Sequence, residues 1–232
     1  VTPEIEDKTL KKLDLKAEKF ASQIVSRDRY AEVVSAISIL ASSYDRIAGN
    51  LRSYQRSEIS EIFEPFKEGQ KGSSAMPHKK NPIGSERISG LSRIIRGYSV
   101  SSLENMVLWN ERDISNSSVE RIIIPDSFNI ACFMTTELTS IIKHMVINYE
   151  QINKNLENAK NKSISQKVLS ELVNNGIDRD KAYRSIQNLI FENNSADELI
   201  KSIEEEFDVD LSSVTNSENI IDNNDSFLDK FN

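Results

Sequence analysis

The stretch GQKGSSAMPHKKNP, residues 69–82, is the most unusual part of the chain. It contains two glycines, two serines, two prolines, three lysines and His78, one of only two histidines. Backbone N–H groups of a Gly-Ser-Ser turn can point inward and form an anion-binding nest. Lys79 would add a positive charge and Asn81 an amide donor beside that nest. The spacing therefore predicts a loop that holds a carboxylate.

A carboxylate held in this way suits one kind of chemistry in particular. If the neighbouring carbon loses a proton, the same donors stabilise the doubly negative aci-carboxylate that develops. The base would be Ser73, whose hydroxyl loses its proton only if the nest, Lys79 and a helix N-terminus favour the alkoxide. The alternative interpretation of this loop is a solvated surface turn with no ligand.

The charge distribution favours a small anionic ligand. The formal net charge is −7, which argues against a protein that binds nucleic acid by general phosphate attraction. Locally the sign reverses, because the only acid between residues 71 and 96 is Glu86. The cations of this segment are Lys71, Lys79, Lys80, Arg87, Arg93 and Arg96, and Arg112 and Arg121 follow.

Long helices must position this loop. Low glycine and proline content predicts an all-α fold, with one helix over about residues 27–62 and a break at Pro65 and the loop. Asn81 is the expected N-cap of a second helix, with Pro82 at its first position. A third helix follows the polar segment NERDISNSS, with a kink expected near Pro125.

Apolar stripes at helical spacing predict the buried faces. The first helix has its stripe at Val33, Ile37, Leu40, Tyr44, Ile47, Leu51 and Tyr54. The second has Ile88, Leu91, Ile95 and Tyr98, and the third has Phe128, Cys132, Leu138, Ile142 and Met145. Helices of this length predict an elongated central bundle for residues 1–147.

Residues 148–232 have a different texture, with shorter helical patterns and an Asn, Lys and Glu surface. Gly176 is the expected stop of one helix, and Ser195 is the expected start of the last clear one. We therefore predict a small helical C-terminal domain over residues 148–232. The tail, from residue 216, is polar and is expected to fray.

Other features bound the setting of the protein. Cys132 is the single cysteine, so no intramolecular disulfide can form, and no apolar run is long enough to cross a bilayer. We expect a cytoplasmic protein that binds neither membrane nor nucleic acid and needs no cofactor or metal. The chain starts at Val1 rather than at a methionine, and we expect it to be the carboxyl-terminal portion of a longer protein.

The stretch GSSAMPHKKNP resembles the signature of the fumarase/aspartase superfamily, whose members eliminate fumarate from succinyl-bearing substrates. Within that superfamily, the flanking segments resemble the adenylosuccinate lyase family. The segments that carry this likeness are SQIVSRDRYAEVVSAI, KKNPIGSER, WNERDISNSSVERIIIPD and SISQKVLSELVNNGIDRDKAYRSIQ. The resemblance implies a homotetramer whose active sites are each built from three subunits. It also implies release of fumarate from adenylosuccinate, giving AMP, and from the succinylocarboxamide ribotide (SAICAR), giving AICAR.

The resemblance implies a role for each matching residue. Ser73 would be the base that takes the proton from the succinyl β-carbon, and Lys79 and Asn81 would hold the succinyl carboxylates. Glu86 would orient the catalytic histidine. The residues that match substrate contacts are Gln23, Arg87, Arg112, Ser117 and Arg121, of which Arg112, Ser117 and Arg121 would hold the nucleotide and its phosphate. The alternative role for Arg112 and Arg121 is ordinary ion pairing at the surface, with Asp113 or Glu120.

The histidine that protonates the departing nitrogen is not identified in this chain. His78 is a poor match, because related signatures accept other residues there, and His144 is expected to be packed or at the surface. The resemblance places the acid on an upstream segment from another subunit. Asn110 and Asn116 stand where bacterial relatives often have histidine.

Two alternatives to this function stay open. The signature loop is shared with argininosuccinate lyase and carboxymuconate cycloisomerase, although the paired arginines in ERDISNSSVER favour a phosphate-bearing nucleotide. A noncatalytic helical assembly module is the other alternative, against which the presence of Ser73, Lys79, Asn81 and Glu86 argues.

Overall fold

The computed structural model describes residues 2–66, 80–191 and 195–215. Within these ranges it contains eight helices and one pair of two-residue strands, so the predicted all-α class is confirmed. Among the described helices, none combines the length and the low polarity that crossing a bilayer requires. The chain divides into two compact units, Val1–Asn148 and Tyr149–Asn232.

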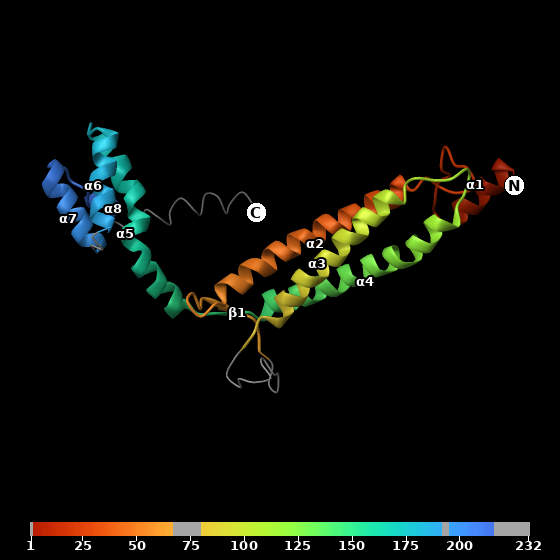
Figure 1. Ribbon diagram of the computed structural model, residues 1–232, viewed down its shortest axis with the longest axis horizontal. Helices are drawn as coiled ribbons and strands as arrows, with labels where there is room; N and C mark the ends of the chain where they lie inside the picture. The colour runs from red at the N-terminus through yellow and green to blue at the C-terminus, as the bar shows by residue number, and fades with distance from the viewer. Residues whose placement is uncertain (1, 67–79, 192–194, 216–232) are drawn as a thin grey trace. The chain divides into compact units, whose positions relative to one another are not determined.

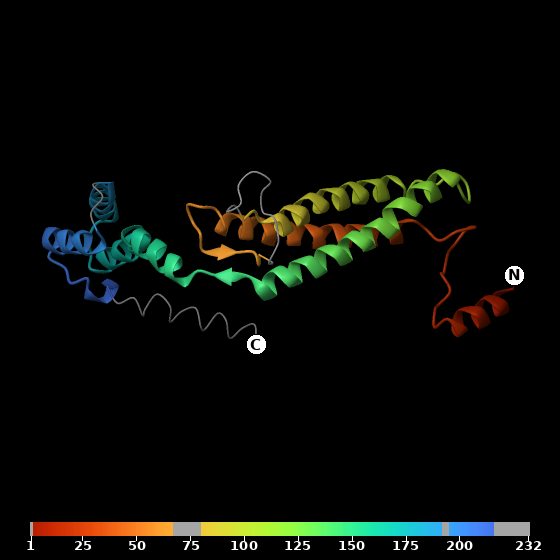
Figure 2. The same cartoon turned by 90° about the horizontal axis from the view of Figure 1, so that it is seen from below.

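The first unit is a bundle of three long helices, which lie side by side in both views (Figures 1 and 2). These helices are α2 (Asp28–Tyr54), α3 (Ile83–Glu104) and α4 (Ile114–His144), and a short helix α1 (Pro3–Lys12) precedes them. Strand β1 (Ile62–Phe63) pairs antiparallel with β2 (Val146–Ile147), with Ile62 opposite Ile147. This pairing joins the segment after α2 to the segment after α4.

Helix α2 ends earlier than the sequence predicts. The expected helix ran to about residue 62, whereas α2 ends at Tyr54 and β1 occupies Ile62–Phe63. After Tyr54 the backbone folds back on itself, since Glu61 donates its N–H to the Tyr54 carbonyl at 3.0 Å. Ser60 has a positive φ of 53°, a conformation that no α-helix contains. The segment is therefore a turn that feeds the short sheet.

The buried faces of the bundle differ in part from the predicted stripes. Ile88 and Ile95 of α3 are fully buried as expected. On α2, however, Val33, Leu40 and Tyr54 are exposed, and the buried positions are Ala31, Val34, Ala41, Ala48 and Leu51. On α4, Phe128, Cys132 and Ile142 are exposed, and the buried apolar positions are Ile123, Met134, Leu138 and Ile141. Alanines at the α2 contact let neighbouring helices approach closely, which leaves the larger side chains at its edges.

A polar seam runs between α2 and α3. Ser92 donates to Asp45 at 3.0 Å, and both terminal nitrogens of Arg96 lie 3.3 Å from the same carboxylate oxygen. Burial acts to raise the pKa of Asp45, but hydrogen bonds from Ser89, Ser92 and Arg96 and the charge of Arg96 outweigh it and lower the pKa. The ionised carboxylate therefore contributes to holding the two helices together.

The variant Asp45→Asn is expected to lower the free energy of unfolding by about 1–2 kcal/mol at neutral pH, because it removes a charge-assisted hydrogen-bond acceptor. Since the folded pKa is lowered, the stabilisation is complete above the ordinary value of 3.8 and is lost as pH falls through the folded pKa. Urea unfolding at several pH values should show the difference from the unmodified chain shrinking below that value. Asp7→Asn, at an exposed position of α1, is the control.

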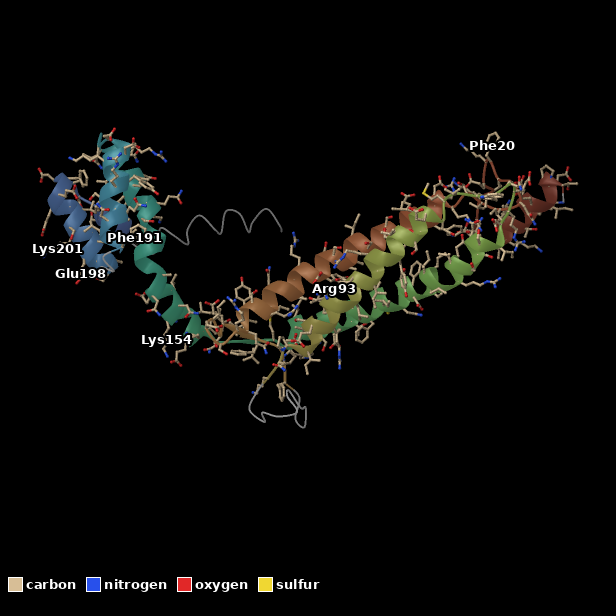
Figure 3. The ribbon with its side chains drawn as sticks, in the orientation of Figure 1. Phe20, Arg93, Lys154, Phe191, Glu198 and Lys201 are labelled. Carbon is tan, nitrogen blue, oxygen red and sulfur yellow. The ribbon has the colours of Figure 1, made fainter. Side chains whose placement is uncertain are left out.

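The second unit contains α5 (Tyr149–Asn174), α6 (Arg179–Phe191), α7 (Ala196–Phe207) and α8 (Ser212–Thr215). Gly176 follows α5 with a φ of +82°, which confirms the predicted stop. Ser195 and Glu198 form a reciprocal capping box at the start of α7, where Figure 3 labels Glu198, so the predicted start is confirmed. The core of this unit includes Val168, Leu172, Leu199, Ile203 and Leu211.

Candidate active site

The predicted catalytic loop lies between the end of β1 and the start of α3. Ser73, Lys79 and His78 belong to residues 67–79, which are outside the described residues, as is the expected anion nest. The two flanks of the loop are described. They end at Phe66 on one side and begin at Lys80 on the other, and the Lys80 ammonium lies 5.4 Å from the centre of the Phe66 ring.

One glutamine ties both flanks to the end of α2. The side-chain amide of Gln55 donates to the Lys80 carbonyl at 2.8 Å, and its oxygen accepts from the Glu64 backbone N–H at 2.9 Å. Gln55 is the C-cap residue of α2, directly after Tyr54. The backbone at Lys80 and Asn81 is therefore fixed to a rigid helix rather than to solvent.

The N-terminus of α3 is capped by a side chain from β1's segment. Glu64 accepts from the backbone N–H groups of Ser85 at 2.7 Å and Gly84 at 3.1 Å. The sequence prediction that Asn81 is the N-cap is wrong, because α3 begins at Ile83 with Pro82 before it and makes no side-chain cap of its own. A negatively charged carboxylate interacts more favourably with the positive end of a helix than a neutral amide does. This explains why Glu64 caps α3 and Asn81 does not.

Close packing fixes the same helix end against α4. A Cβ added at Gly84 would lie 2.7 Å from Ile141 Cδ1 and 3.2 Å from Glu64 Oε2, too near for any other residue to fit without movement. The start of α3 therefore lies beside the C-terminal part of α4. Glu86, in the first turn of α3, takes its position from this arrangement.

A hollow of about 950 Å³ lies at this end of the bundle. Both Asn81 and Glu86 line it, so the structure brings together two of the predicted site residues. Glu86 is exposed and Asn81 is partly buried. Arg87 is exposed and is not part of the lining. The other lining residues are Gly49, Arg52, Ser53, Gln55, Arg56, Ser57, Ser60, Phe63, Lys80 and Pro82.

A second group of predicted residues lies at the start of α4. Asp113 caps that helix by accepting from the Ser115 N–H at 2.9 Å, and Ser117 and Arg121 follow on one face, one turn apart. Ser22 donates to the Glu111 carbonyl at 3.1 Å, which brings the segment containing Gln23 beside Arg112. The structure therefore brings these predicted substrate contacts to one place.

Arg121 does not lie at the positive end of a helix. Helix α4 begins at Ile114, so Arg121 lies two turns inside it, beyond the first turn where the dipole acts. Ser117 lies closer to the start of α4 and donates its hydroxyl to the Ile114 carbonyl at 3.2 Å. Any attraction that Arg121 has for an anion comes from its own charge.

The acids expected to neutralise Arg112 and Arg121 are engaged elsewhere. Glu120 accepts from Arg27 at 2.7 Å and 3.3 Å, in a pair with side-chain exposures of 7% for Arg27 and 17% for Glu120. Asp113 is the helix cap. Among the described residues, neither Arg112 nor Arg121 makes an ion pair, so both exposed cations are available to a ligand.

Buried amides hold this segment in shape. Asn116 is 2% exposed and donates to the carbonyls of Asn105 at 2.7 Å and Val107 at 3.1 Å. Asn105 donates in return to the Asn116 carbonyl at 3.1 Å and to Glu120 at 3.3 Å. Hydrogen bonds of Asn105 and Asn116 therefore hold the loop between α3 and α4 in its conformation, directly before Ser117.

The two groups of predicted residues lie at opposite ends of the bundle. Gly84 packs on Ile141, near the end of α4, while Ser117 is near its start. The 24 residues between Ser117 and Ile141 span about 36 Å of helix at 1.5 Å per residue. One chain therefore cannot place both groups against the same small molecule.

Of the two histidines, His78 lies outside the described residues and His144 is described. His144 is exposed at the end of α4, and its Nδ1 lies 2.9 Å from the Ser140 carbonyl, which agrees with the expected surface position. Within the described ranges, no three His, Cys, Asp or Glu side chains are grouped as metal ligands would be.

Sequence comparison links the chain to lyases. Residues 1–97 match a family described as lyase. An adenylosuccinate lyase of Aquifex aeolicus is 48% identical over 187 residues, and one of Thermotoga maritima is 47% identical over the same length. These alignments cover 81% of this chain. Over 81% of its length the chain is therefore similar to adenylosuccinate lyases, and over residues 1–97 it matches the lyase family.

Two solved structures share the fold of this chain. The 3-carboxy-cis,cis-muconate lactonizing enzyme of Pseudomonas putida covers 86% of this chain with a TM-score of 0.74 and 22% identity. A fumarate lyase of Mesorhizobium covers 87% with a TM-score of 0.75 and 18% identity. The chain covers 46% and 44% of these two structures. It spans 43% of the length of each of the two adenylosuccinate lyases.

Sequence reasoning missed several residues of this candidate site. Gln55 and Glu64, which hold the loop flanks and the start of α3, gave no signal, because both depend on contacts between segments distant in sequence. Arg52 and Arg56 did carry a signal. They are two cations four residues apart, shortly before the basic loop, although Arg56 lies beyond the end of α2.

Proposed function

We propose that the protein containing this chain eliminates fumarate from adenylosuccinate to give AMP, and from SAICAR to give AICAR, in purine nucleotide biosynthesis. The observation that carries this proposal is the 48% identity to an adenylosuccinate lyase over 81% of the chain. Residues 1–147 would be part of the catalytic bundle, and residues 148–232 the small C-terminal domain.

The reaction divides among the predicted residues as follows. Ser73, as alkoxide, removes a proton from the succinyl β-carbon, and Lys79 and Asn81 stabilise the charge that enters the adjacent carboxylate. The electron pair then forms the C=C bond of fumarate as the C–N bond breaks. An acid protonates the departing nitrogen, and Glu86 orients the histidine that acts as this acid.

Nucleotide binding falls to the group at the start of α4. Arg112 and Arg121 are exposed and unpaired among the described residues, which suits charge-assisted hydrogen bonds to a phosphate. Ser117 and Gln23 would contribute neutral hydrogen bonds. Arg87, beside Glu86, would contact the substrate from α3.

Separation of the two groups within one chain supports a site shared between subunits. Succinyl and nucleotide parts of one substrate could meet Asn81 and Arg121 only if the two residues came from different chains. A homotetramer would allow this, as the superfamily resemblance implies. Large apolar side chains on the outside of the bundle support such an assembly. These side chains are 42–69% exposed, and they include Val33, Ile39, Leu40, Ile94, Val100, Phe128 and Ile142.

Light scattering at micromolar concentration should give a mass near four times that of one full-length chain. The exposed apolar faces of α2, α3 and α4 would otherwise meet water, which favours burial against other copies. A monodisperse monomer at that concentration would contradict the shared site.

The function itself is tested with adenylosuccinate and the full-length protein. Turnover is followed by the loss of substrate absorbance, and fumarate is measured separately as a released product. Argininosuccinate and 3-carboxy-cis,cis-muconate are the comparison substrates, because enzymes of the same superfamily use them. Turnover of either of these, without turnover of adenylosuccinate, would replace the proposal with one of the alternatives.

A further inference from the structure

The hollow beside Asn81 and Glu86 contains two arginines that the proposed reaction does not use. Arg52 is in the last turn of α2, Arg56 follows two residues after this helix ends at Tyr54, and both line the hollow. Lys80 lines it from the far side of the loop, where Gln55 fixes its backbone. Two separate segments therefore place three cations around one space.

These cations are not neutralised by the protein. Three other arginines of this unit have acidic partners, in the pairs Arg27–Glu120, Arg29–Glu18 and Arg96–Asp45. By contrast, Arg52 donates to the neutral hydroxyl of Ser89 at 3.4 Å, and within the described residues neither Arg56 nor Lys80 has an ion pair. Among the described residues of the lining, Glu86 is the one acid.

Grouping like charges in this way costs stability. Cations that line one hollow repel each other, and a third cation adds to the repulsion. The C-terminal end of a helix favours positive charge, which lowers this cost for Arg52 but does not account for Arg56 or Lys80, which lie outside α2. Local arrangements that oppose stability in this way occur mainly at functional sites.

We propose that Arg52 and Arg56 form an oxyanion subsite that binds a carboxylate of the succinyl group, across the hollow from Asn81 and Glu86. This inference rests on the proposed function for the identity of the ligand. A guanidinium group can donate two parallel hydrogen bonds to one carboxylate, so the arginines suit this ligand better than lysines would.

The carboxylate is favoured over the phosphate of the nucleotide by position. Glu86, which lines the same hollow, is assigned to the reacting end of the substrate. Phosphate is assigned to Arg112 and Arg121, which lie toward the other end of α4 in the same chain, about 30 Å or more away. A substrate whose succinyl group occupies the hollow would reach those arginines on a neighbouring subunit.

The test uses the full-length protein and two separate ligands, fumarate and AMP, in titration calorimetry. Arg56→Gln and Arg52→Gln should each raise the Kd for fumarate about tenfold, since each removes a charge-assisted contact. The Kd for AMP should change less than about twofold. Arg56→Lys should fall between the glutamine variant and the unmodified protein, because it keeps the charge but loses the paired donors.

Arg46→Gln is the matched control, since Arg46 is an exposed arginine of α2 that does not line the hollow. Circular dichroism and the thermal midpoint show whether each variant keeps its fold. Unchanged fumarate affinity in the folded Arg52→Gln and Arg56→Gln variants overturns the subsite. Weaker AMP binding with unchanged fumarate binding also overturns it, because the arginines would then hold phosphate.

Failure of the subsite and failure of the proposed function give different results. If the unmodified protein turns over adenylosuccinate while the arginine variants bind fumarate normally, only the subsite is wrong. If the unmodified protein binds fumarate in an Arg56-dependent way but does not act on adenylosuccinate, the carboxylate subsite stands and the proposed function is wrong.

Discussion

The variant Ser73→Ala is expected to lower kcat for fumarate release from adenylosuccinate by about a thousandfold or more, with little change in KM. The hydroxyl is proposed to act only as the base, so its loss removes the proton acceptor while the carboxylate contacts of Lys79 and Asn81 stay. Binding and transition-state stabilisation by those residues would leave a small residual rate.

Ser43→Ala is the control for this measurement. Ser43 is on α2, donates its hydroxyl to the Ile39 carbonyl at 3.2 Å within the same helix, and is not one of the predicted site residues. Its kcat should equal that of the unmodified protein. Should Ser73→Ala turn over as fast as Ser43→Ala, another group is the base and the interpretation of the loop is wrong.

Mixing two inactive variants is expected to restore activity. Ser73→Ala and Arg121→Gln would each be nearly inactive alone, because every site in such a homo-oligomer lacks one essential side chain. In a mixed oligomer, some sites combine Ser73 from one chain with Arg121 from another. Co-expression should therefore give a rate about tenfold or more above that of either variant.

The sharpest control for complementation is a second pair from one segment. Ser73→Ala mixed with Lys79→Ala should stay inactive, since each chain's loop supplies both residues and every site then lacks one of them. If activity returned in this control, the recovery could not be explained by sites that combine intact segments from different chains. No restoration with Arg121→Gln would place both residue groups in sites that a single chain completes.

Local patterns were sufficient for several elements. Gly176 and Ser195 were predicted correctly as the stop of α5 and the start of α7, since a positive φ and a capping box depend on residues within one turn. Ile88 and Ile95 were correctly predicted to be buried. Composition alone indicated an all-α chain, because helix formers dominate and glycine and proline are few.

The end of α2 and the cap of α3 were not predictable in this way. Helix α2 stops at Tyr54 because the following residues turn back to form β1, whose partner β2 is more than eighty residues away. The cap of α3 is Glu64 rather than Asn81, and it lies about twenty residues earlier in the chain. Both outcomes depend on contacts that have no local sequence pattern.

The predicted buried faces of α2 and α4 were partly wrong for a related reason. Val33, Leu40, Phe128 and Ile142 have helical spacing, yet they are exposed, while Ala41 and Ala48 are buried. Periodicity identifies an apolar face but not the neighbour that covers it. An oligomer can bury two faces of one helix, and a single chain then reveals only one of them.

For the candidate site, the amino-acid sequence by itself determined which side chains are present: a serine in a glycine turn, a lysine and an amide beside it, and a pair of arginines near a serine. Those identities carry the resemblance and the chemistry. Only the tertiary structure decided where they lie, with Asn81 and Glu86 at one end of α4 and Arg112, Ser117 and Arg121 at the other. The physical reason is the rigidity of a long helix, which keeps residues at its two ends apart and so requires more than one chain to build the proposed site.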